Sequence, residues 1–297
     1  MKVRELLNEG TEKLEAAGID NAAYDARVIL EDAYGLDAAG LLMNLNRDIC
    51  PGALGGTEPS DIRECPGDCG AISTFNMGIN MRLRHVPLQH IIGHTGFMGL
   101  DFKVSRDVLI PRQDTETLVE TVLDRETDTR ISILDLCTGS GCIAVSLKKL
   151  GGYSQVAASD LSDKAIGLAM RNASINDAEI RLIKSDLFKD IEGSFDVIVS
   201  NPPYIPTEEI ETLSPEVRDH DPRLALDGGS DGLDIYRRIV SECGDVLNTG
   251  GRLYMEIGFD QAAAVGGLME KAGFRDIEVV KDLAGKDRVI FGILTLK

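Results

Sequence analysis

The feature that most constrains the fold of this chain is a regular alternation of short apolar runs and helical segments that begins after Arg112. Strands are expected at residues 131–136, 156–159, 180–184, 195–200, 252–257, 277–280 and 289–293. Helices are expected at residues 142–150, 163–176, 233–247 and 261–272, after a first helix that Asp114 or Thr115 can cap and that runs to Leu123. The alternation predicts an α/β fold with a mostly parallel sheet and helices on both faces. Only a short turn at Gly285 separates the last two strands, so the last strand is expected to be antiparallel.

The N-terminal part has a different pattern. Its apolar residues recur at helical spacing near residues 3–14, 22–34 and 41–45, which predicts a helical hairpin or small bundle. Residues 51–70 are rich in Gly and Pro and read as a loop, and a helix is expected to resume at residues 75–84. We therefore expect an N-terminal helical domain at 1–86, a linking hairpin at 87–112 and a larger α/β domain at 113–297.

Composition narrows the classes of partner. The chain has 297 residues and a formal net charge of −18, which disfavours nucleic acid because the phosphate backbone repels an acidic protein. No apolar stretch approaches the roughly 20 residues that cross a bilayer, and residues 1–10 lack the apolar core of a signal peptide, so we expect a cytoplasmic protein. Cys50, Cys65 and Cys69 do not have paired metal-ligand spacing, so free thiols and no metal are expected.

Acidic residues lie at the carboxyl ends of three successive expected strands. Asp135 precedes a glycine loop at residues 137–141, Asp160 ends the second strand, and Asp186 follows the third. Ligands of open α/β sheets bind at this carboxyl edge, where glycines let the backbone approach a ligand at a helix N-terminus. A carboxylate at Asp160 can accept from two ribose hydroxyls, and Asp186 can meet an adenine edge. The sequence therefore predicts a nucleoside-containing cofactor.

The glycine loop by itself leaves the cofactor open. Gly139, Gly141 and Ala144 also fit a dinucleotide fingerprint, with Asp160 where a ribose-binding acid is expected. A dehydrogenase of the Rossmann type is therefore one alternative, although such enzymes usually lack an acid at the position of Asp135.

Four residues that directly follow the expected strand at 195–200 favour a different chemistry: Asn201, Pro202, Pro203 and Tyr204. An amide nitrogen is a weak nucleophile, so a site must hold its NH2 group with the lone pair facing an electrophilic methyl group. The side-chain oxygen of Asn201 and the carbonyl of Pro202 can each accept one N–H bond. The prolines remove backbone donors and stiffen the segment, and Tyr204 offers a flat face. Positioning and desolvation would suffice for methyl transfer from S-adenosylmethionine.

The order of several motifs resembles the PrmC/HemK family. These motifs are Gln89-His-Ile-Ile-Gly93, Phe97-Met-Gly-Leu100, Ile110-Pro-Arg-Gln-Asp-Thr-Glu116, the glycine loop and Asn201-Pro-Pro-Tyr204. The resemblance implies a class I seven-strand S-adenosylmethionine-dependent methyltransferase with a small N-terminal helical domain. It also implies a role in translation termination, because the family methylates the glutamine of the Gly-Gly-Gln motif in class I peptide chain release factors.

The resemblance also implies roles for individual residues. The cofactor would be held by Cys137, Thr138, Gly139, Ser140, Gly141, Asp160, Asp186, Leu187 and Asn201. The substrate glutamine would be held by Asn201, Pro202, Pro203 and Tyr204, and the N-terminal helices would grip the release factor. Leu187 stands where the family sometimes has an aromatic residue, and the loop at 51–70 is longer than usual. Two further alternatives stay open, an amino-methyltransferase of DNA or RNA and a cofactor-binding module without catalysis.

Overall fold

The computed structural model describes residues 1–49 and 68–295. It divides into two compact units, Met1–Gly93 and His94–Lys297. Each unit has its own buried core.

The first unit is helical in the part that the structure describes. Its helices are α1 (Val3–Ala16), α2 (Ala22–Tyr34), α3 (Ala38–Asn44), α4 (Asp68–Arg82) and α5 (Leu88–Ile92). Leu6, Leu30 and Phe75 are among the side chains that form its core. Within this core Arg82 donates from Nε to Asp25 at 2.6 Å, which pairs two buried charges. The predicted helical bundle is confirmed.

Helix α4 begins earlier than the sequence predicted, because Asp68 lies inside the expected loop at 51–70. Ala71 and Ile72 pack into the apolar core, and Asp68 forms an ion pair with Arg47 at 2.8 Å. Burial of one helical face therefore outweighs the local glycine content. The rest of the expected loop, residues 51–67, lies outside the described residues.

The second unit opens with a short antiparallel hairpin, β1 (His94–Phe97) and β2 (Leu100–Lys103). Phe97 and Phe102 meet edge to face with ring centroids 6.0 Å apart and are buried. The side chain of Asn172 holds the hairpin against the rest of this unit. It accepts from the Lys103 backbone N–H at 2.8 Å and donates to the Lys103 carbonyl at 3.1 Å.

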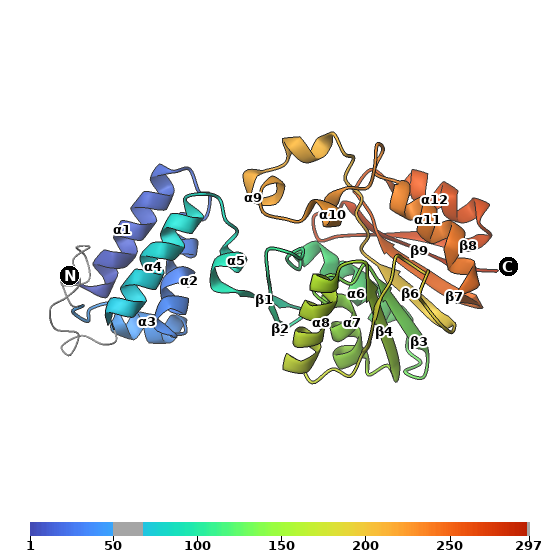
Figure 1. Cartoon of the computed structure of the whole chain (residues 1–297), viewed down its shortest axis with the longest axis horizontal. Coiled ribbons are helices and arrows are strands. Elements are labelled where there is room, and N and C mark those ends of the chain that lie inside the picture. Colours follow the sequence, from blue (N-terminus) through green and yellow to red (C-terminus); the bar gives the residue numbers. More distant parts are fainter. Residues whose placement is uncertain (50–67, 296–297) are drawn as a thin grey trace. The chain divides into compact units, whose positions relative to one another are not determined.

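A seven-stranded sheet forms the centre of this unit, in the order β5-β4-β3-β6-β7-β9-β8 (Figure 1). Its strands are β3 (Ser132–Leu136), β4 (Gln155–Asp160), β5 (Arg181–Lys184), β6 (Phe195–Ser200), β7 (Leu247–Glu256), β8 (Phe274–Lys281) and β9 (Asp287–Leu294). The pairs from β5 to β7 are parallel, whereas β9 runs antiparallel to both β7 and β8. The predicted α/β fold with an antiparallel last strand is confirmed.

Helices cover both faces of the sheet (Figure 1). They are α6 (Gln113–Arg125), α7 (Cys142–Ser146) with a π-helical turn at Leu147–Gly151, α8 (Asp163–Ile175), α11 (Asp234–Glu242) and α12 (Ala262–Lys271). Two expectations need correction. The helix predicted at 233–247 stops at Glu242, because Leu247 is buried and starts β7 opposite Phe195. Asp114 and Thr115 do not cap α6, whose N-cap residue is Arg112.

Alternation along the central strands assigns side chains to the two faces. In β7, Leu253 and Met255 join the core beneath α11 and α12, whereas Tyr254 joins the core beneath α6 and α7. Because side chains two residues apart share a face of a strand, Glu256 lies on the same face as Tyr254. The last residue of β7 therefore points to the α6 side.

An irregular segment of residues 205–233 leads from Tyr204 to α11. The sequence pattern predicts no helix or strand between residues 205 and 232. The segment contains a 3₁₀ turn (Glu209–Thr212) and the short helices α9 (Pro215–Arg218) and α10 (Arg223–Leu226). A bridge between Ile205 and Asp227 closes it on itself. Arg112 also pairs with the fully buried side chain of Asp221, which ties the segment to the start of α6. None of the described helices in either unit is both long and apolar enough to cross a membrane.

Candidate functional site

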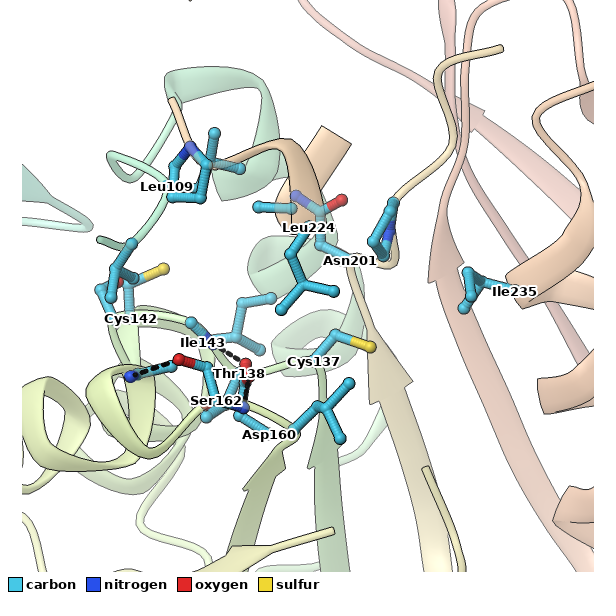
Figure 2. A pocket seen from close by; sticks show the side chains of 18 of the residues that line it. Leu109, Cys137, Thr138, Cys142, Ile143, Asp160, Ser162, Asn201, Leu224 and Ile235 are labelled. Atoms are coloured by element: carbon cyan, nitrogen blue, oxygen red, sulfur yellow. Dashed lines mark hydrogen bonds between the residues drawn. The ribbon is translucent and has the colours of Figure 1, made fainter. Parts of the chain in front are cut away.

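A cavity of about 560 Å³ opens at the carboxyl ends of β3, β4 and β6. Its wall includes Cys137, Thr138, Gly139, Ser140, Cys142, Ile143, Asp160, Asp186, Leu187, Asn201 and Pro203, with Ile110 to Arg112 and Pro222 to Ala225. Figure 2 shows Thr138 and Asp160 on one side of the cavity and Asn201 with Leu224 on another. Ligands of open α/β sheets bind at this edge, so the cavity is the candidate site.

The glycine loop after β3 is built on the carboxylate of Asp135. Oδ2 of Asp135 accepts from the Thr138 hydroxyl at 2.6 Å and from the Ala144 backbone N–H at 3.2 Å. The loop uses the left-handed region, with φ of 55° at Gly139 and 82° at Gly141. A Cβ on Gly141 would lie 3.0 Å from the Cβ of Ala169, so only glycine lets the loop approach α8 this closely.

Asp135 is fully buried, and burial raises the pKa of its carboxyl group to about 7. Its second oxygen, Oδ1, has no hydrogen-bond partner among the described residues. Hydrogen bonds from Thr138 and Ala144 offset only part of the cost of burying the charge. This residue therefore supports the loop from below, and it does not line the cavity.

Asp160 ends β4 and does line the cavity. Its Oδ2 accepts from the Gly139 backbone N–H at 2.9 Å, and its Oδ1 accepts from the Ser162 N–H at 2.8 Å. Burial raises the pKa of Asp160, and these backbone donors partly lower it again. A carboxylate has about four acceptor positions, so Asp160 retains capacity for ligand hydroxyls.

The next strand contributes Asp186 and Leu187, which both line the cavity. Asp186 pairs with Nη2 of Arg238 at 2.9 Å, while the side chain of Leu187 is buried. Leu187 has a φ of 49°, a conformation that non-glycine residues rarely adopt and that often marks a functional turn. The predicted Asp186 and Leu187 therefore stand beside an arginine that the sequence did not single out.

Residues 201–204 lie at the end of β6, where the structure brings Asn201 and Pro203 to the cavity wall. Pro202 is buried beneath them. Nδ2 of Asn201 donates to the Thr115 hydroxyl oxygen at 3.1 Å. The backbone carbonyl of Tyr204 accepts from the Gln261 side chain at 2.9 Å, which fixes the end of the segment.

Sequence reasoning missed two buried residues behind this segment. Glu256, at the end of β7, accepts at Oε1 from the Tyr204 hydroxyl at 3.3 Å, and Thr115 on α6 accepts from Asn201. Burial raises the pKa of Glu256 to about 7 and raises that of Tyr204 well above its usual value. Glu256 could have been found from its place at a strand end, the same logic that found Asp160, but the expected strand ran one residue past it.

The described part of the chain holds no group of three or more His, Cys, Asp or Glu side chains that could bind a metal ion. Cys69, Cys137, Cys142 and Cys243 are free thiols there. Burial raises the pKa of Cys137 and of Cys142 to about 12, so neither is a reactive thiolate near neutral pH.

Comparison with known proteins identifies the family of this chain and agrees with the fold described above. Residues 112–214 match the methyltransferase small domain, and residues 5–54 match the PrmC N-terminal domain. A release factor glutamine methyltransferase of Geobacter sulfurreducens is 41% identical over 291 residues, covering 98% of this chain and 96% of that protein. A second one, of Caulobacter vibrioides, is 38% identical over 286 residues, covering 95% of this chain and 93% of that protein.

Solved structures agree at the level of fold. A methyltransferase from Pyrococcus furiosus superposes with a TM-score of 0.52 at 21% identity, covering 68% of this chain and 92% of that one. The catalytic domain of hMettl16 superposes with a TM-score of 0.54 at 15% identity, covering 67% of this chain and 77% of that one. The methyltransferase fold expected from the sequence is thereby confirmed.

Proposed function

The chain belongs to the family of release factor glutamine methyltransferases, and from this membership we propose that it transfers a methyl group from S-adenosylmethionine to the side-chain amide nitrogen of a release factor glutamine. The observation that carries the proposal is the position of Asn201 on the wall of the same cavity as the glycine loop and Asp160. One cavity can then receive both the cofactor and the amide.

The residues of the cavity fit S-adenosylmethionine in their chemistry. Its volume of about 560 Å³ is typical of small-molecule sites. Apolar walls suit an adenosine, and the half-buried carboxylate of Asp160 retains acceptor capacity for ribose hydroxyls. We accordingly propose that Cys137 to Gly141, Asp160, Asp186, Leu187 and Asn201 hold the cofactor.

When bound, S-adenosylmethionine supplies an electrophilic methyl group on a positively charged sulfur. The chain's own residues hold the amide. Asn201 uses Nδ2 to bond Thr115, which leaves Oδ1 to accept one N–H of the substrate. Pro202 and Pro203 have no backbone N–H, so this segment offers carbonyl acceptors without competing donors. Partial burial of Asn201 and Tyr204 excludes water and strengthens these bonds.

The partner and place of the reaction are part of the same proposal. We propose that the reaction takes place in the cytoplasm and that the N-terminal unit, part of which matches the PrmC N-terminal domain, contacts a class I release factor whose Gly-Gly-Gln glutamine is held by residues 201–204. Exposed apolar side chains on α3, Leu42 at 69% and Met43 at 81%, support a contact surface there. The net charge of −18 supports a protein partner over nucleic acid.

The test is incubation of the purified chain with isotopically labelled S-adenosylmethionine and a purified release factor. Peptide mass mapping should place one methyl group on the glutamine of the Gly-Gly-Gln motif. A folded chain that binds the cofactor but leaves every glutamine of the release factor unmodified would contradict the proposal. Label in a nucleic acid added in parallel would favour the amino-methyltransferase alternative.

A further inference from the structure

A buried carboxyl group behind residues 201–204 has no part in the mechanism above. Glu256 is only 2% exposed, and its backbone carbonyl accepts from the Tyr236 hydroxyl at 2.8 Å. Its Oε1 accepts from the Tyr204 hydroxyl at 3.3 Å. Its Oε2 is buried and has no hydrogen-bond partner among the described residues. A carboxylate in this position can accept further hydrogen bonds.

Thr115 connects this carboxyl group to Asn201. It is 3% exposed and lies on α6, the helix that packs on the same face of the sheet as Glu256. Its hydroxyl oxygen accepts from Nδ2 of Asn201 at 3.1 Å. The same hydroxyl lies near enough to the Glu256 carboxyl group to favour its charged form and so lower its pKa. A continuous path of side chains therefore joins Glu256, Thr115 and Asn201.

The direction of each bond in this path follows from the carboxylate. Above about pH 7 the Glu256 carboxyl group is ionised, has no proton and can only accept, so the single hydroxyl proton of Thr115 then points to Glu256. The Thr115 oxygen can then only accept, and it must face the NH2 end of the Asn201 amide. None of the hydrogen bonds among the described residues uses Oδ1 of Asn201, which is left for a ligand.

This direction matters because an amide has a donor end and an acceptor end. A substrate glutamine presents an NH2 group, which needs an acceptor. If the Asn201 amide were turned over, two NH2 groups would face each other, and neither could bond. Leaving buried polar groups unpaired in this way is costly.

Resting on the proposed function, we infer that Thr115 and Glu256 are positioning residues that hold the Asn201 amide with its oxygen toward the substrate NH2 group. They act through Asn201: Glu256 does not line the cavity, and Thr115, which does line it, has its hydroxyl oxygen engaged by Nδ2 of Asn201. Thr115 supplies the acceptor that Nδ2 requires, and Glu256 sets the direction of the Thr115 hydroxyl.

The first test compares Thr115→Val, Thr115→Ser and Glu256→Gln in single-turnover methylation of a release factor. Loss of a preorganised partner commonly slows a reaction about a hundredfold, so we expect Thr115→Val and Glu256→Gln to lose about tenfold or more. Cofactor affinity, measured by calorimetry, should stay within about twofold. Thr115→Ser retains the hydroxyl and should recover most of the rate.

Thr121→Val is the matched control. Thr121 lies on the same helix, is 7% exposed, and donates its hydroxyl to the Thr117 carbonyl at 2.6 Å, away from the cavity. The control removes an equally buried hydroxyl and should change stability without changing the rate. If Thr115→Val lowers the rate no more than Thr121→Val does, Thr115 is only structural and the inference is wrong.

The second test uses Asn201→Asp, because a carboxylate has acceptors at both ends and has no orientation to fix. Thr115→Val should slow the wild type strongly but should slow the Asn201→Asp background little. Equal losses in both backgrounds would overturn the inference. If the Asp variant is too slow to measure, the comparison of Thr115→Val with Thr115→Ser decides.

These outcomes are separate from the fate of the proposed function. If the unmodified chain methylates no release factor, the proposed function fails before any variant is made. If it methylates the glutamine and Thr115→Val remains fast, only the positioning role fails.

Discussion

At the scale of single residues, Asn201 has an amide whose two ends have different neighbours, Thr115 at Nδ2 and the cavity at Oδ1. We expect Asn201→Ala to fold and bind the cofactor yet lose on the order of a hundredfold in methyl transfer, the usual effect of removing a preorganised partner. Asn201→Asp should retain more activity, because it can still accept from an NH2 group. Single-turnover rates with parallel cofactor titrations measure both.

Wild-type rates in Asn201→Ala would mean that residues 201–204 are not the reaction site. A variant that no longer binds the cofactor would instead indicate that the side chain belongs to cofactor binding alone. The two results are distinguished by the same pair of measurements.

Asp160 should give the opposite pattern, because its carboxylate already holds the backbone of Gly139 and Ser162 and has spare acceptors. Hydrogen bonds to a charged group contribute roughly 1.5 to 3 kcal/mol each, so Asp160→Ala should weaken cofactor binding at least about tenfold. Calorimetry measures this directly. Asp163→Ala is the control, since Asp163 is an exposed acid at the start of α8 that does not line the cavity. Unchanged affinity in Asp160→Ala would remove it from the cofactor site.

At the scale of secondary-structure elements, the spacing of apolar residues predicted most of the fold. The strand and helix patterns in residues 113–297 reflect burial on both faces of the sheet. Boundaries were less predictable. The helix expected at 233–247 contains Leu247, whose apolar side chain suits a helix or a strand equally, and pairing with Phe195 decides for the strand. Such pairing depends on residues far apart in the chain.

The candidate-site residues at the ends of strands could be predicted from the sequence. The residues that pack behind them could not. Asp160 and Asn201 directly follow or end strands, so their meeting at one edge could be expected. Thr115 looked like a helix cap, and only the packing of α6 against β7 reveals that it faces Asn201. The segment at 205–233 has no periodic pattern, so its contacts could not be read from sequence.

We expect that segment to position Tyr204 nevertheless, and a substitution at Gly228 tests this expectation. A Cβ on Gly228 would lie 2.8 Å from the Cα of Tyr204 and 2.8 Å from the carbonyl oxygen of Gly232, both backbone atoms that cannot easily move. A small misplacement of a reacting group can cost about a hundredfold in rate, so Gly228→Ala should slow methylation more than it weakens cofactor binding. Gly244→Ala, with no atom within 4 Å of its added Cβ, is the control. Equal behaviour of the two variants would show that the segment does not set the position of Tyr204.

At the scale of the whole molecule, two buried carboxyl groups link the site to folding stability. Asp135 lies in β3 beneath the glycine loop and Glu256 is the last residue of β7. Burial raises the pKa of each to about 7. In the unfolded chain both return to ordinary values near 4. The folded state therefore binds more protons than the unfolded state between about pH 4 and pH 7.

Linkage fixes the sign of the effect. Where the folded state binds more protons, the free energy of unfolding falls as pH rises, so the contribution of each group is largest below about pH 4 and is lost as pH rises through about 7. The charged groups around Glu256 that take part are Arg288 and Asp114, beside the hydroxyls of Tyr204 and Tyr236. Asp135 is the cleaner probe, because after burial the uncharged Thr138 and Ala144 have the largest effects on its pKa and the charge of Asp160 has a smaller one.

We therefore predict the pH dependence of Asp135→Asn relative to the wild type, measured by urea unfolding from pH 4 to pH 8. The wild type minus variant difference in free energy of unfolding should fall as pH rises to about 7 and then level off. A tenfold change in a protonation equilibrium corresponds to about 1.4 kcal/mol, so the fall should be at least that large. Taking the difference cancels the self-repulsion of the net charge of −18, which both proteins share. A difference that stays constant over this range would mean that Asp135 titrates as an ordinary carboxyl group and that the glycine loop rests on a charged support.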